Sequence, residues 1–255
     1  APTPPVIGLK QGMIITSSVL VKPDIYQLNG YDSLNRPVIL IKGDNITVDF
    51  NRALLQGSSD RQLPNGFYGL ALLIKGNNIT LKNARVTGYK VAVMADLKIE
   101  NSDFSYNYRQ QLQSTWLHED VSDWMSYHHN ENDEWLRYGA GIYLKDCNGS
   151  VIKNNTITGG QCALMMMRSN DGLITDNDFS FNSAIGIGMY RSSRNNILHN
   201  KLDFNVRGHS DGFYNRGQDS AGILVFEQCN ENVFAYNSVT HGGDGFFLWA
   251  GQTTM

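Results

Sequence analysis

Three carboxylates near the C-terminal end of the chain are candidates for acid–base chemistry: Asp219, Asp244 and Glu227. Asp219 and Asp244 each precede a predicted strand in adjacent repeats, so their Cα atoms would lie about 5 Å apart if the repeats stack in register. Two carboxylates at that distance raise the pKa of one of them, which suits an acid beside a base or a nucleophile. Alternatively, each aspartate caps a turn, because both stand next to Gly or Ser.

Glu227, His241 and Arg216 complete the candidate catalytic set. Glu227 could transfer a proton, or it could pair with Arg191 across the outer face of the predicted sheet. His241 could act as an acid or a base, and His209 flanks the same region, but either histidine could equally be a solvated turn residue. Arg216 could neutralise a substrate carboxylate or act as a base.

Outward-pointing residues of the predicted strands are candidates for substrate binding. If Ile142 and Leu144 point inward, Tyr143 and Lys145 point outward, and Glu227 would align with Lys145 if one extra residue is absorbed near 222. The aromatic rings could stack on sugar rings or could pack against neighbouring strands. The candidate substrate-binding residues are Tyr143, Lys145, Tyr190, Arg191, His209 and Trp249.

Sulfur and imidazole side chains provide weaker candidates. The run 165–167 is Met-Met-Met, which could offer thioether ligands to copper, but only alternate members share a face, so one lies in the core. His128 and His129 are adjacent and would not converge on a metal from a strand. The three cysteines (Cys147, Cys162 and Cys229) lack metal-ligand spacing and are expected to be small buried hydrophobes. We therefore predict no metal ligands.

These candidates must be positioned by an internal repeat. Its frame is a segment like Gly-Ile-x-Leu followed by one like Asn-x-Ile-x-x-Asn-x-Ile, as in 141–144 with 150–157, and in 186–189 with 195–202, where Ser150, Met189 and Leu202 are the departures. Asn155, Asn177 and Asn200 recur at intervals of 22 and 23 residues. A period in the low twenties is typical of a solenoid. The alternation of apolar and polar residues within each period favours strands over helices.

The 26 asparagines explain how the coils could stack. An Asn at the same bend of every coil can bond to the Asn above and below it, and it tolerates the left-handed backbone of a sharp corner. We therefore predict an all-β fold: a right-handed, single-stranded parallel β-helix of about 22–23 residues per coil, with three short strands in each coil.

Residues 1–35 are expected to form an N-terminal extension and cap, and 36–255 the parallel β-helix. Two insertions interrupt the repeat, at about 105–138 and 207–220, both just before the Gly-Ile-x-Leu strand, so both should rise on the same side. Because the chain stops at Met255 in mid-coil, the C-terminal end is expected to be incomplete. The start Ala1-Pro-Thr-Pro-Pro suggests a mature N-terminus, and hence a secreted or periplasmic protein.

The repeat frames, together with Val38-Ile-Leu-Ile-Lys-Gly-Asp-Asn-Ile-Thr-Val-Asp-Phe-Asn51, resemble the right-handed parallel β-helix proteins of the pectate-lyase-like superfamily. That group includes polysaccharide lyases, glycoside hydrolases, mannuronan epimerases and NosD-like repeat proteins. The resemblance covers roughly residues 36 to 249 and indicates the fold more strongly than the activity. It implies that the saccharide cleft lies on the face of the Gly-Ile-x-Leu strands and their preceding loops.

The resemblance favours an enzyme that cleaves a polysaccharide in a groove on the β-helix. The acids favour a glycoside hydrolase slightly over a polysaccharide lyase, because a hydrolase needs two carboxylates about the scissile bond, whereas a lyase needs a base and a cationic group or Ca²⁺. No cofactor is expected unless a lyase uses Ca²⁺. The alternative is a non-catalytic glycan-binding, adhesion or NosD-like accessory protein. If Asp219, Asp244 and Glu227 point apart, the hydrolase hypothesis fails.

Composition limits the classes of molecule that the protein could bind. The net charge of −3 gives no electrostatic footprint for nucleic acid. No apolar run approaches the roughly 18 residues that could span a bilayer. The expected partner is therefore a polysaccharide or oligosaccharide, and the oligomeric state stays open.

Overall fold

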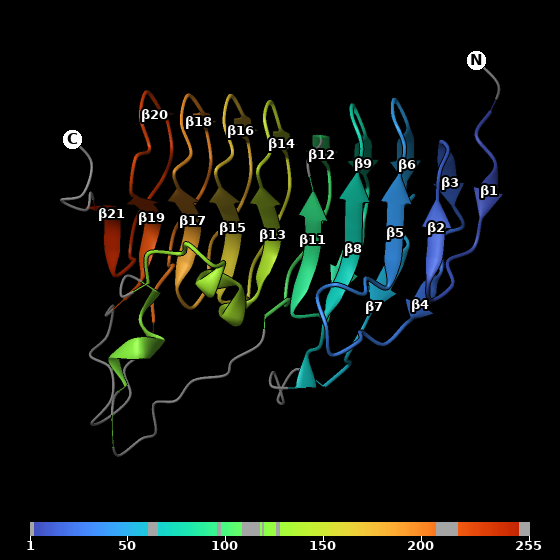
Figure 1. The fold of residues 1–255 in the computed structure, drawn as a ribbon, viewed down its shortest axis with the longest axis horizontal. Helices are drawn as coiled ribbons and strands as arrows, with labels where there is room; N and C mark the ends of the chain where they lie inside the picture. Colours follow the sequence, from blue (N-terminus) through green and yellow to red (C-terminus); the bar gives the residue numbers. More distant parts are fainter. Residues whose placement is uncertain are drawn as a thin grey trace.

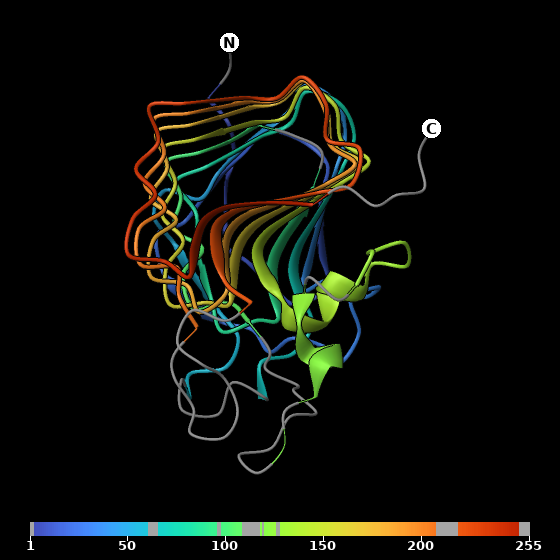
Figure 2. The same ribbon diagram turned by 90° about the vertical axis from the view of Figure 1, so that its left-hand side faces the viewer.

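The chain winds into a right-handed parallel β-helix, and each of its sheets joins strands from successive coils. The computed structural model describes residues 3–60, 66–95, 98–108, 118, 120–125, 128–207 and 219–249. The coils follow one another in sequence order along a single axis (Figure 1), and in the view along that axis they superpose as a tube (Figure 2). Within the described ranges, no helix has both the length and the apolar composition to cross a membrane.

One wall of the tube, which we call the long-strand sheet, takes one strand from each coil and carries the Gly-Ile-x-Leu segments. Its strands, in spatial order, are β2 (Met13–Ile15), β5 (Ile39–Lys42), β8 (Leu70–Lys75), β11 (Val91–Ala95), β13 (Ala140–Lys145), β15 (Cys162–Met167), β17 (Ile185–Tyr190), β19 (Ala221–Phe226) and β21 (Asp244–Trp249).

A second wall, the short-strand sheet, is built the same way from strands of two or three residues. Its strands are β1 (Val6–Ile7), β3 (Val19–Val21), β6 (Thr47–Asp49), β9 (Thr80–Lys82), β12 (Lys98–Glu100), β14 (Val151–Lys153), β16 (Leu173–Thr175), β18 (Asn196–Leu198) and β20 (Val233–Ala235).

The third side of the tube changes along the axis. In the early coils it is a small sheet of β4 (Ile25–Gln27), β7 (Leu54–Gln56) and β10 (Arg85–Thr87). In later coils it shrinks to single-residue parallel bridges, which join Arg85, Asp103, Thr156, Asp178, Lys201 and Ser238 in turn. The expected three strands per coil therefore hold only for the early coils.

The strand register fixes which residues share a position. Ile142 pairs with Leu164, and Leu164 with Ile187, so the predicted period is confirmed. The parallel pairing already begins with β1 to β4, inside the range expected to be an N-terminal extension and cap. The reason is that short apolar alternations such as Met13–Ile15 supply inward residues early in the chain.

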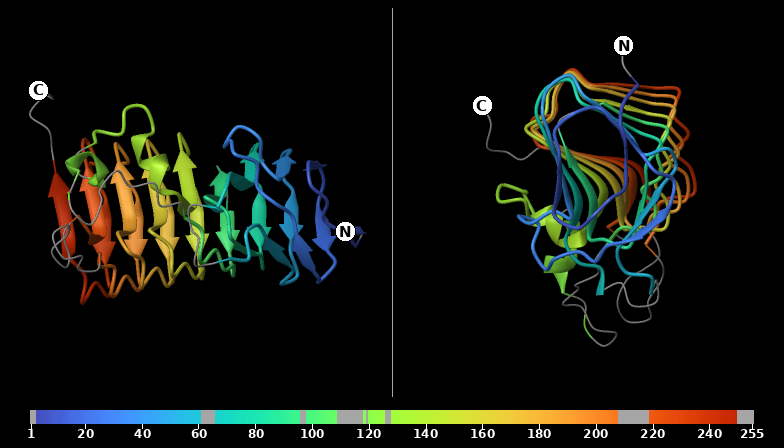
Figure 3. Two further views of the ribbon diagram at one scale, coloured as in Figure 1. Left: turned by 90° about the horizontal axis from the view of Figure 1, so that it is seen from below. Right: turned by 90° about the vertical axis from the view of Figure 1, so that its right-hand side faces the viewer.

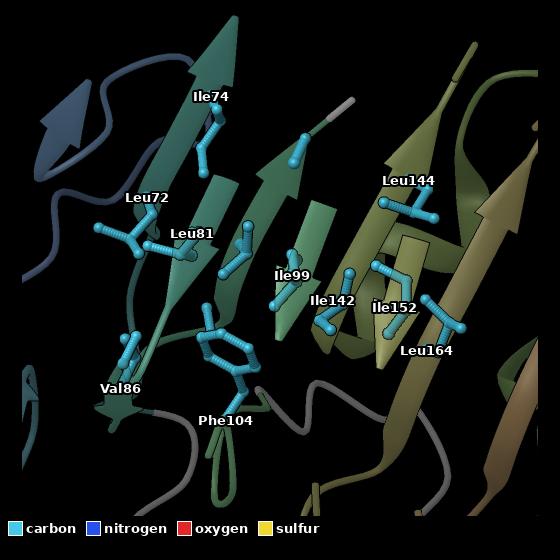
Figure 4. Packing of buried hydrophobic residues seen from close by; sticks show 14 of the residues in the cluster. Leu72, Ile74, Leu81, Val86, Ile99, Phe104, Ile142, Leu144, Ile152 and Leu164 are labelled. Carbon is cyan, nitrogen blue, oxygen red and sulfur yellow. The ribbon is translucent and has the colours of Figure 1, made fainter. Parts of the chain in front are cut away.

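The interior of the tube is a continuous apolar core. Figure 4 shows Leu72 and Leu81 of one coil side by side, with Ile99 of the next coil farther along the interior, and all three are fully buried. Of the Met run, Met166 belongs to this inner core, whereas Met165 and Met167 point to the outside of the wall and are buried there. The alternation predicted for that run is confirmed.

Asparagine ladders run along the corners of the tube, as the sequence predicts. Asn177 donates through Nδ2 to Asn200 Oδ1 (2.9 Å), and its own Oδ1 accepts from the backbone N (2.9 Å) and Nδ2 (3.0 Å) of Asn155. Asn200 continues the chain to Asn237. All three inner members, Asn155, Asn177 and Asn200, are buried, so each amide satisfies backbone groups that water cannot reach.

We expect Asn177→Ala to destabilise the fold by about 3 kcal/mol, because it leaves the backbone N–H of Asn155 buried without its acceptor and removes the donor to the Ile152 carbonyl oxygen. The matched control is Asn148→Ala, since Asn148 is exposed and accepts a single side-chain bond from Asn170. Urea unfolding followed by circular dichroism measures both. Equal losses in the two variants would contradict a special role for the buried ladder.

Candidate functional site

An insertion covers the outer face of the long-strand sheet. Its described part contains two short 3-10 helices, η2 (Val121–Asp123) and η4 (Glu134–Tyr138), and it lies outside the wall of long strands (Figure 2; Figure 3, right). The Trp135 ring packs edge-on against Tyr190 (centroids 6.0 Å apart) and Phe226 (5.8 Å). A second buried apolar cluster thus forms outside the tube, with Met125 and Tyr138 among its members.

This outer layer closes the face on which a cleft was expected. Tyr143 and Tyr190 do point outward from the tube, but both are fully covered by the insertion. Neither ring therefore offers a free face for stacking on a sugar, and of the two alternatives that the sequence left open, both rings follow the packing one. The Tyr143 hydroxyl donates to Asp133 Oδ1 (3.1 Å), and Lys145 contacts the other oxygen of that carboxylate.

Hydrogen bonds fix the insertion internally. Trp135 Nε1 donates to the Met125 carbonyl oxygen (2.9 Å), and the Tyr138 hydroxyl donates to the Asp123 carbonyl oxygen (2.6 Å). The fully buried Asp123 carboxylate accepts from Arg137 (2.9 Å). Because the polar groups of these buried side chains find partners, the insertion has a defined conformation against the sheet.

Asp219 joins the two insertions. Its side chain is 3% exposed, and Oδ2 accepts from the backbone N of Met125 (2.7 Å) and from Arg207 Nη2 (3.1 Å). Asp244 is exposed and pairs in register with Ala221. The two aspartates therefore occupy different register positions and different environments, so the expected carboxylate pair does not form.

The segment 129–134 runs along the C-terminal ends of the long strands. Its charged side chains form separate ion pairs with residues of several coils. His129 Nδ1 lies 3.4 Å from Glu227 Oε1, and the carboxylate of Glu131 grips Arg191 through two contacts (2.5 and 3.1 Å). Asp133 contacts Lys145 farther along the same edge. Every second residue of this segment thus contacts a different coil: His129 contacts the coil of β19, Glu131 that of β17 and Asp133 that of β13.

Glu227 lies at a sharp corner of this edge. The residues that meet at this corner form a group that we call the strand-end cluster: His129, Glu131, Tyr190, Arg191, Glu227 and Trp249. Strand pairing aligns Tyr190 with Phe226 and Phe226 with Trp249, so Phe226, and not Glu227, takes the place of Lys145. Glu227 follows one position later, in the left-handed backbone region (φ 53°), as Arg191 does in the coil before (φ 47°). That one-residue step places the carboxylate beside the insertion.

The strand-end cluster combines buried and exposed groups. The Glu227 side chain is 5% exposed, whereas that of His129 is 62% exposed. Burial raises the pKa of the Tyr190 hydroxyl, and the neighbouring Glu131 raises it further. Trp249, 47% exposed, stacks on Phe226 with centroids 6.0 Å apart. A buried carboxylate, an accessible imidazole, a guanidinium and an indole thus share one corner.

The catalytic residues predicted from sequence do not all meet at this corner. Asp219, Asp244 and His241 precede or begin the strands of the last coils, and Glu227 follows them. Six residues of strand separate the two positions, which is roughly 20 Å. His241 stacks on Phe204 (4.6 Å) and contacts Thr240 Oγ1 (3.0 Å), at the corner that leads into the long strands. Arg216 and His209 lie outside the described residues.

The structure does bring together four of the predicted residues: Tyr190, Arg191, Glu227 and Trp249. It adds His129 and Glu131, which sequence reasoning missed as partners. The sequence showed only that the insertion is acidic and carries histidines. The spacing of its residues does not reveal which coil His129 or Glu131 contacts. The expected pairing of Glu227 with Arg191 is replaced by Glu227 with His129 and Arg191 with Glu131.

Fold and site together define a parallel β-helix protein with a polar cluster at one strand edge. Residues 70–255 match the family model of the periplasmic copper-binding protein (NosD), and the chain belongs to that family. Among solved structures, it is similar to the A-module of the Azotobacter vinelandii mannuronan C-5 epimerase AlgE6, at 13% identity over 96% of this chain and 77% of that chain, with a TM-score of 0.34. No curated protein matches the chain.

Proposed function

We propose that the protein cleaves an acidic polysaccharide by β-elimination at the strand-end cluster, in the periplasm or outside the cell. The observation that carries the proposal is the accessible imidazole of His129, whose Nδ1 faces the buried carboxylate of Glu227. A carboxylate on one ring nitrogen orients a histidine and stabilises its protonated form. Within the described part of the chain, the other nitrogen, Nε2, makes no hydrogen bond, so it is available to a substrate.

Arg191 supports an acidic substrate. Its guanidinium forks onto Glu131, whose side chain is 50% exposed. Exposed pairs of this kind contribute little stability, so a uronate carboxylate can replace Glu131 on the same fork. The bound guanidinium would then stabilise the negative charge that develops next to the uronate carboxyl group. Trp249 offers an exposed aromatic face beside it.

The proposed elimination moves one proton from C5 to O4 through His129. His129 Nε2 removes the proton from C5 of the uronate, the C5–H electron pair forms the C4=C5 double bond, and the C4–O4 bond breaks. The protonated imidazole, paired with Glu227, returns the proton to the departing O4. Elimination fits better than hydrolysis here because Asp219 and Asp244 lie far from Glu227, so the three acids cannot flank one glycosidic bond.

A panel of acidic and neutral polysaccharides tests the proposal, with new reducing ends and the ultraviolet absorbance of an unsaturated uronate measured together. We expect both signals on uronate polymers, at a rate that EDTA leaves unchanged because Arg191 replaces Ca²⁺. Reducing ends without absorbance would mean hydrolysis and contradict the elimination. Binding without either signal would support the alternative of a glycan-binding accessory protein.

Copper binding is the property for which the NosD family is named, and one pair of sulfur atoms in this chain favours it. Cys162 Sγ and Met125 Sδ lie 3.4 Å apart in the outer cluster, and soft sulfur ligands suit Cu(I). The donor chemistry does not fit, however. Burial raises the pKa of the Cys162 thiol to about 12, and the nearby positive charge of Arg207 lowers this pKa only in part. A protonated thiol near a guanidinium disfavours a bound cation.

We expect Cys162 to resist alkylation in the native protein. With a pKa of about 12, only about 1 thiol in 10,000 is ionised at pH 8, and the thiolate is the reactive form. Iodoacetamide labelling followed by peptide mass spectrometry measures this, with the urea-unfolded protein as control. Prompt labelling of Cys162 at pH 8 would show an accessible thiolate and reopen the copper hypothesis.

A further inference from the structure

A polar groove lies on the outside of the tube, away from the strand-end cluster. It has a volume of about 490 Å³ and opens at the corner that follows the short strands. The short strands separate this corner from the corner that carries Glu227. Its lining includes Arg52, Arg85, Asn101, Asp103 and Asn154.

Four successive coils contribute to the groove. Asn83, Asn101 and Asn154 directly follow the register-aligned residues Lys82, Glu100 and Lys153, so they form one row along the tube. Arg85, Asp103 and Thr156 form the second row, joined by parallel bridges. With about 4.8 Å between coils, four coils give a length of roughly 14 Å. The groove therefore suits an extended ligand that runs along the tube axis.

The guanidinium groups of Arg52 and Arg85 have no partner among the residues that the structure describes. Neither the Arg52 nor the Arg85 side chain makes a hydrogen bond or an ion pair with any other residue that the structure describes. Two lysines outside the groove lining differ, because Lys82 pairs with Asp49 (3.4 Å) and Lys201 with Asp178 (3.8 Å). Two free forks in one groove can each receive a carboxylate or sulfate oxygen pair.

The remaining lining groups indicate hydroxyls in the same ligand. Asn154 Nδ2 donates to Asn101 Oδ1 (2.7 Å), which leaves the Asn154 side-chain oxygen, one N–H of Asn154 and both N–H groups of the Asn101 amide for a ligand. Asp103 already accepts from the backbone N of Ser105 through one oxygen, and its other oxygen can accept from a hydroxyl. A carboxylate repels a bare phosphate, but it suits a molecule that carries both hydroxyls and separate oxyanions.

We propose that this groove is a second binding site, which holds an acidic oligosaccharide through Arg52 and Arg85. The groove lies on a different corner from the strand-end cluster and shares no residue with it. It would hold a chain of uronate residues on the outside of the tube whether or not the strand-end cluster cleaves that chain. The site thus gives the protein a way to stay attached to an acidic polymer.

Isothermal titration at low salt with tetragalacturonate tests the site. The titrated protein carries Glu227→Gln, so that the probe is not consumed. We expect Arg52→Ala/Arg85→Ala to weaken binding by about tenfold or more, because both charge-assisted contacts are lost. The matched control is Arg194→Ala/Lys201→Ala, which removes the same charge from two exposed ion pairs elsewhere.

Three results would overturn the proposal: equal binding by both double variants, equal binding of a neutral tetrasaccharide such as cellotetraose, or full displacement of the probe by inorganic phosphate at equal concentration. An Arg191→Ala protein keeps the groove intact and should still bind the probe there. Loss of binding only in Arg191→Ala would place the saccharide at the strand-end cluster alone. Failure of the groove is thus separable from failure of the proposed cleavage.

Discussion

Glu227→Gln is expected to lower kcat/KM on a uronate polymer by roughly 10²–10⁴-fold, with little change in stability. The amide keeps the shape of the carboxylate at this buried corner but can no longer stabilise protonated His129, whose Nδ1 lies 3.4 Å from Glu227. His129→Gln should cost a similar factor. Because the two residues act as a unit, the double variant should be hardly worse than either single variant.

Glu231→Gln is the matched control, since this exposed glutamate follows Glu227 by four residues on the same corner and lies outside the strand-end cluster. Initial rates of uronate absorbance measure all four proteins, and thermal unfolding shows that each is folded. Multiplicative losses in the double variant, or an equal loss in Glu231→Gln, would contradict a His129–Glu227 unit.

Asp219→Ala is expected to destabilise the protein by about 3–5 kcal/mol, because it removes the acceptor of a buried ion pair. Arg207 then loses its 3.1 Å contact inside the fold, and the backbone N of Met125 loses its 2.7 Å acceptor. The insertion should therefore detach from the long-strand sheet before the tube unfolds. Limited proteolysis should cut within 121–138 at protease concentrations that leave the wild-type protein intact.

Asp244→Ala is the comparison variant, because Asp244 is exposed at the start of β21 and should change stability by less than about 0.5 kcal/mol. Arg207→Ala/Asp219→Ala should recover part of the loss, since no charge is left buried. If Asp219→Ala leaves stability unchanged but abolishes activity, Asp219 is catalytic, as the sequence first indicated, and the structural role is wrong.

The candidate site could be predicted only in part. Outward alternation placed Tyr190 on the outer face, and strand pairing aligns Tyr190 with Phe226 and Phe226 with Trp249. Arg191 lies at the corner that follows Tyr190, as its place after the repeat segment indicated. The repeat frame of 222–225 against 186–189 already aligns Phe226 with Tyr190, and the extra residue assumed near 222, which would have aligned Glu227 with Lys145, does not occur. Arg52 and Arg85 carried no signal either, since nothing in their sequence neighbourhood shows that other coils leave them unpaired.

The sequence by itself determined the tube. Its period, its inward alternation and the ladder through Asn155, Asn177 and Asn200 repeat from coil to coil, so each copy reports the same local geometry. Such signals are strong because every coil pairs with the next in the same register and must satisfy the same buried backbone groups.

Only the tertiary structure decided what covers the tube and where charged groups meet. The contacts that dock the insertion join residues far apart in the chain: 60 positions separate Glu131 from Arg191, and 94 separate Met125 from Asp219. A contact made once has no period, and its residue types alone do not specify a partner. The insertion buried Tyr143 and Tyr190, and it buried Asp219 against Met125 and Arg207, because covering the apolar outer face of the long strands removes that surface from water.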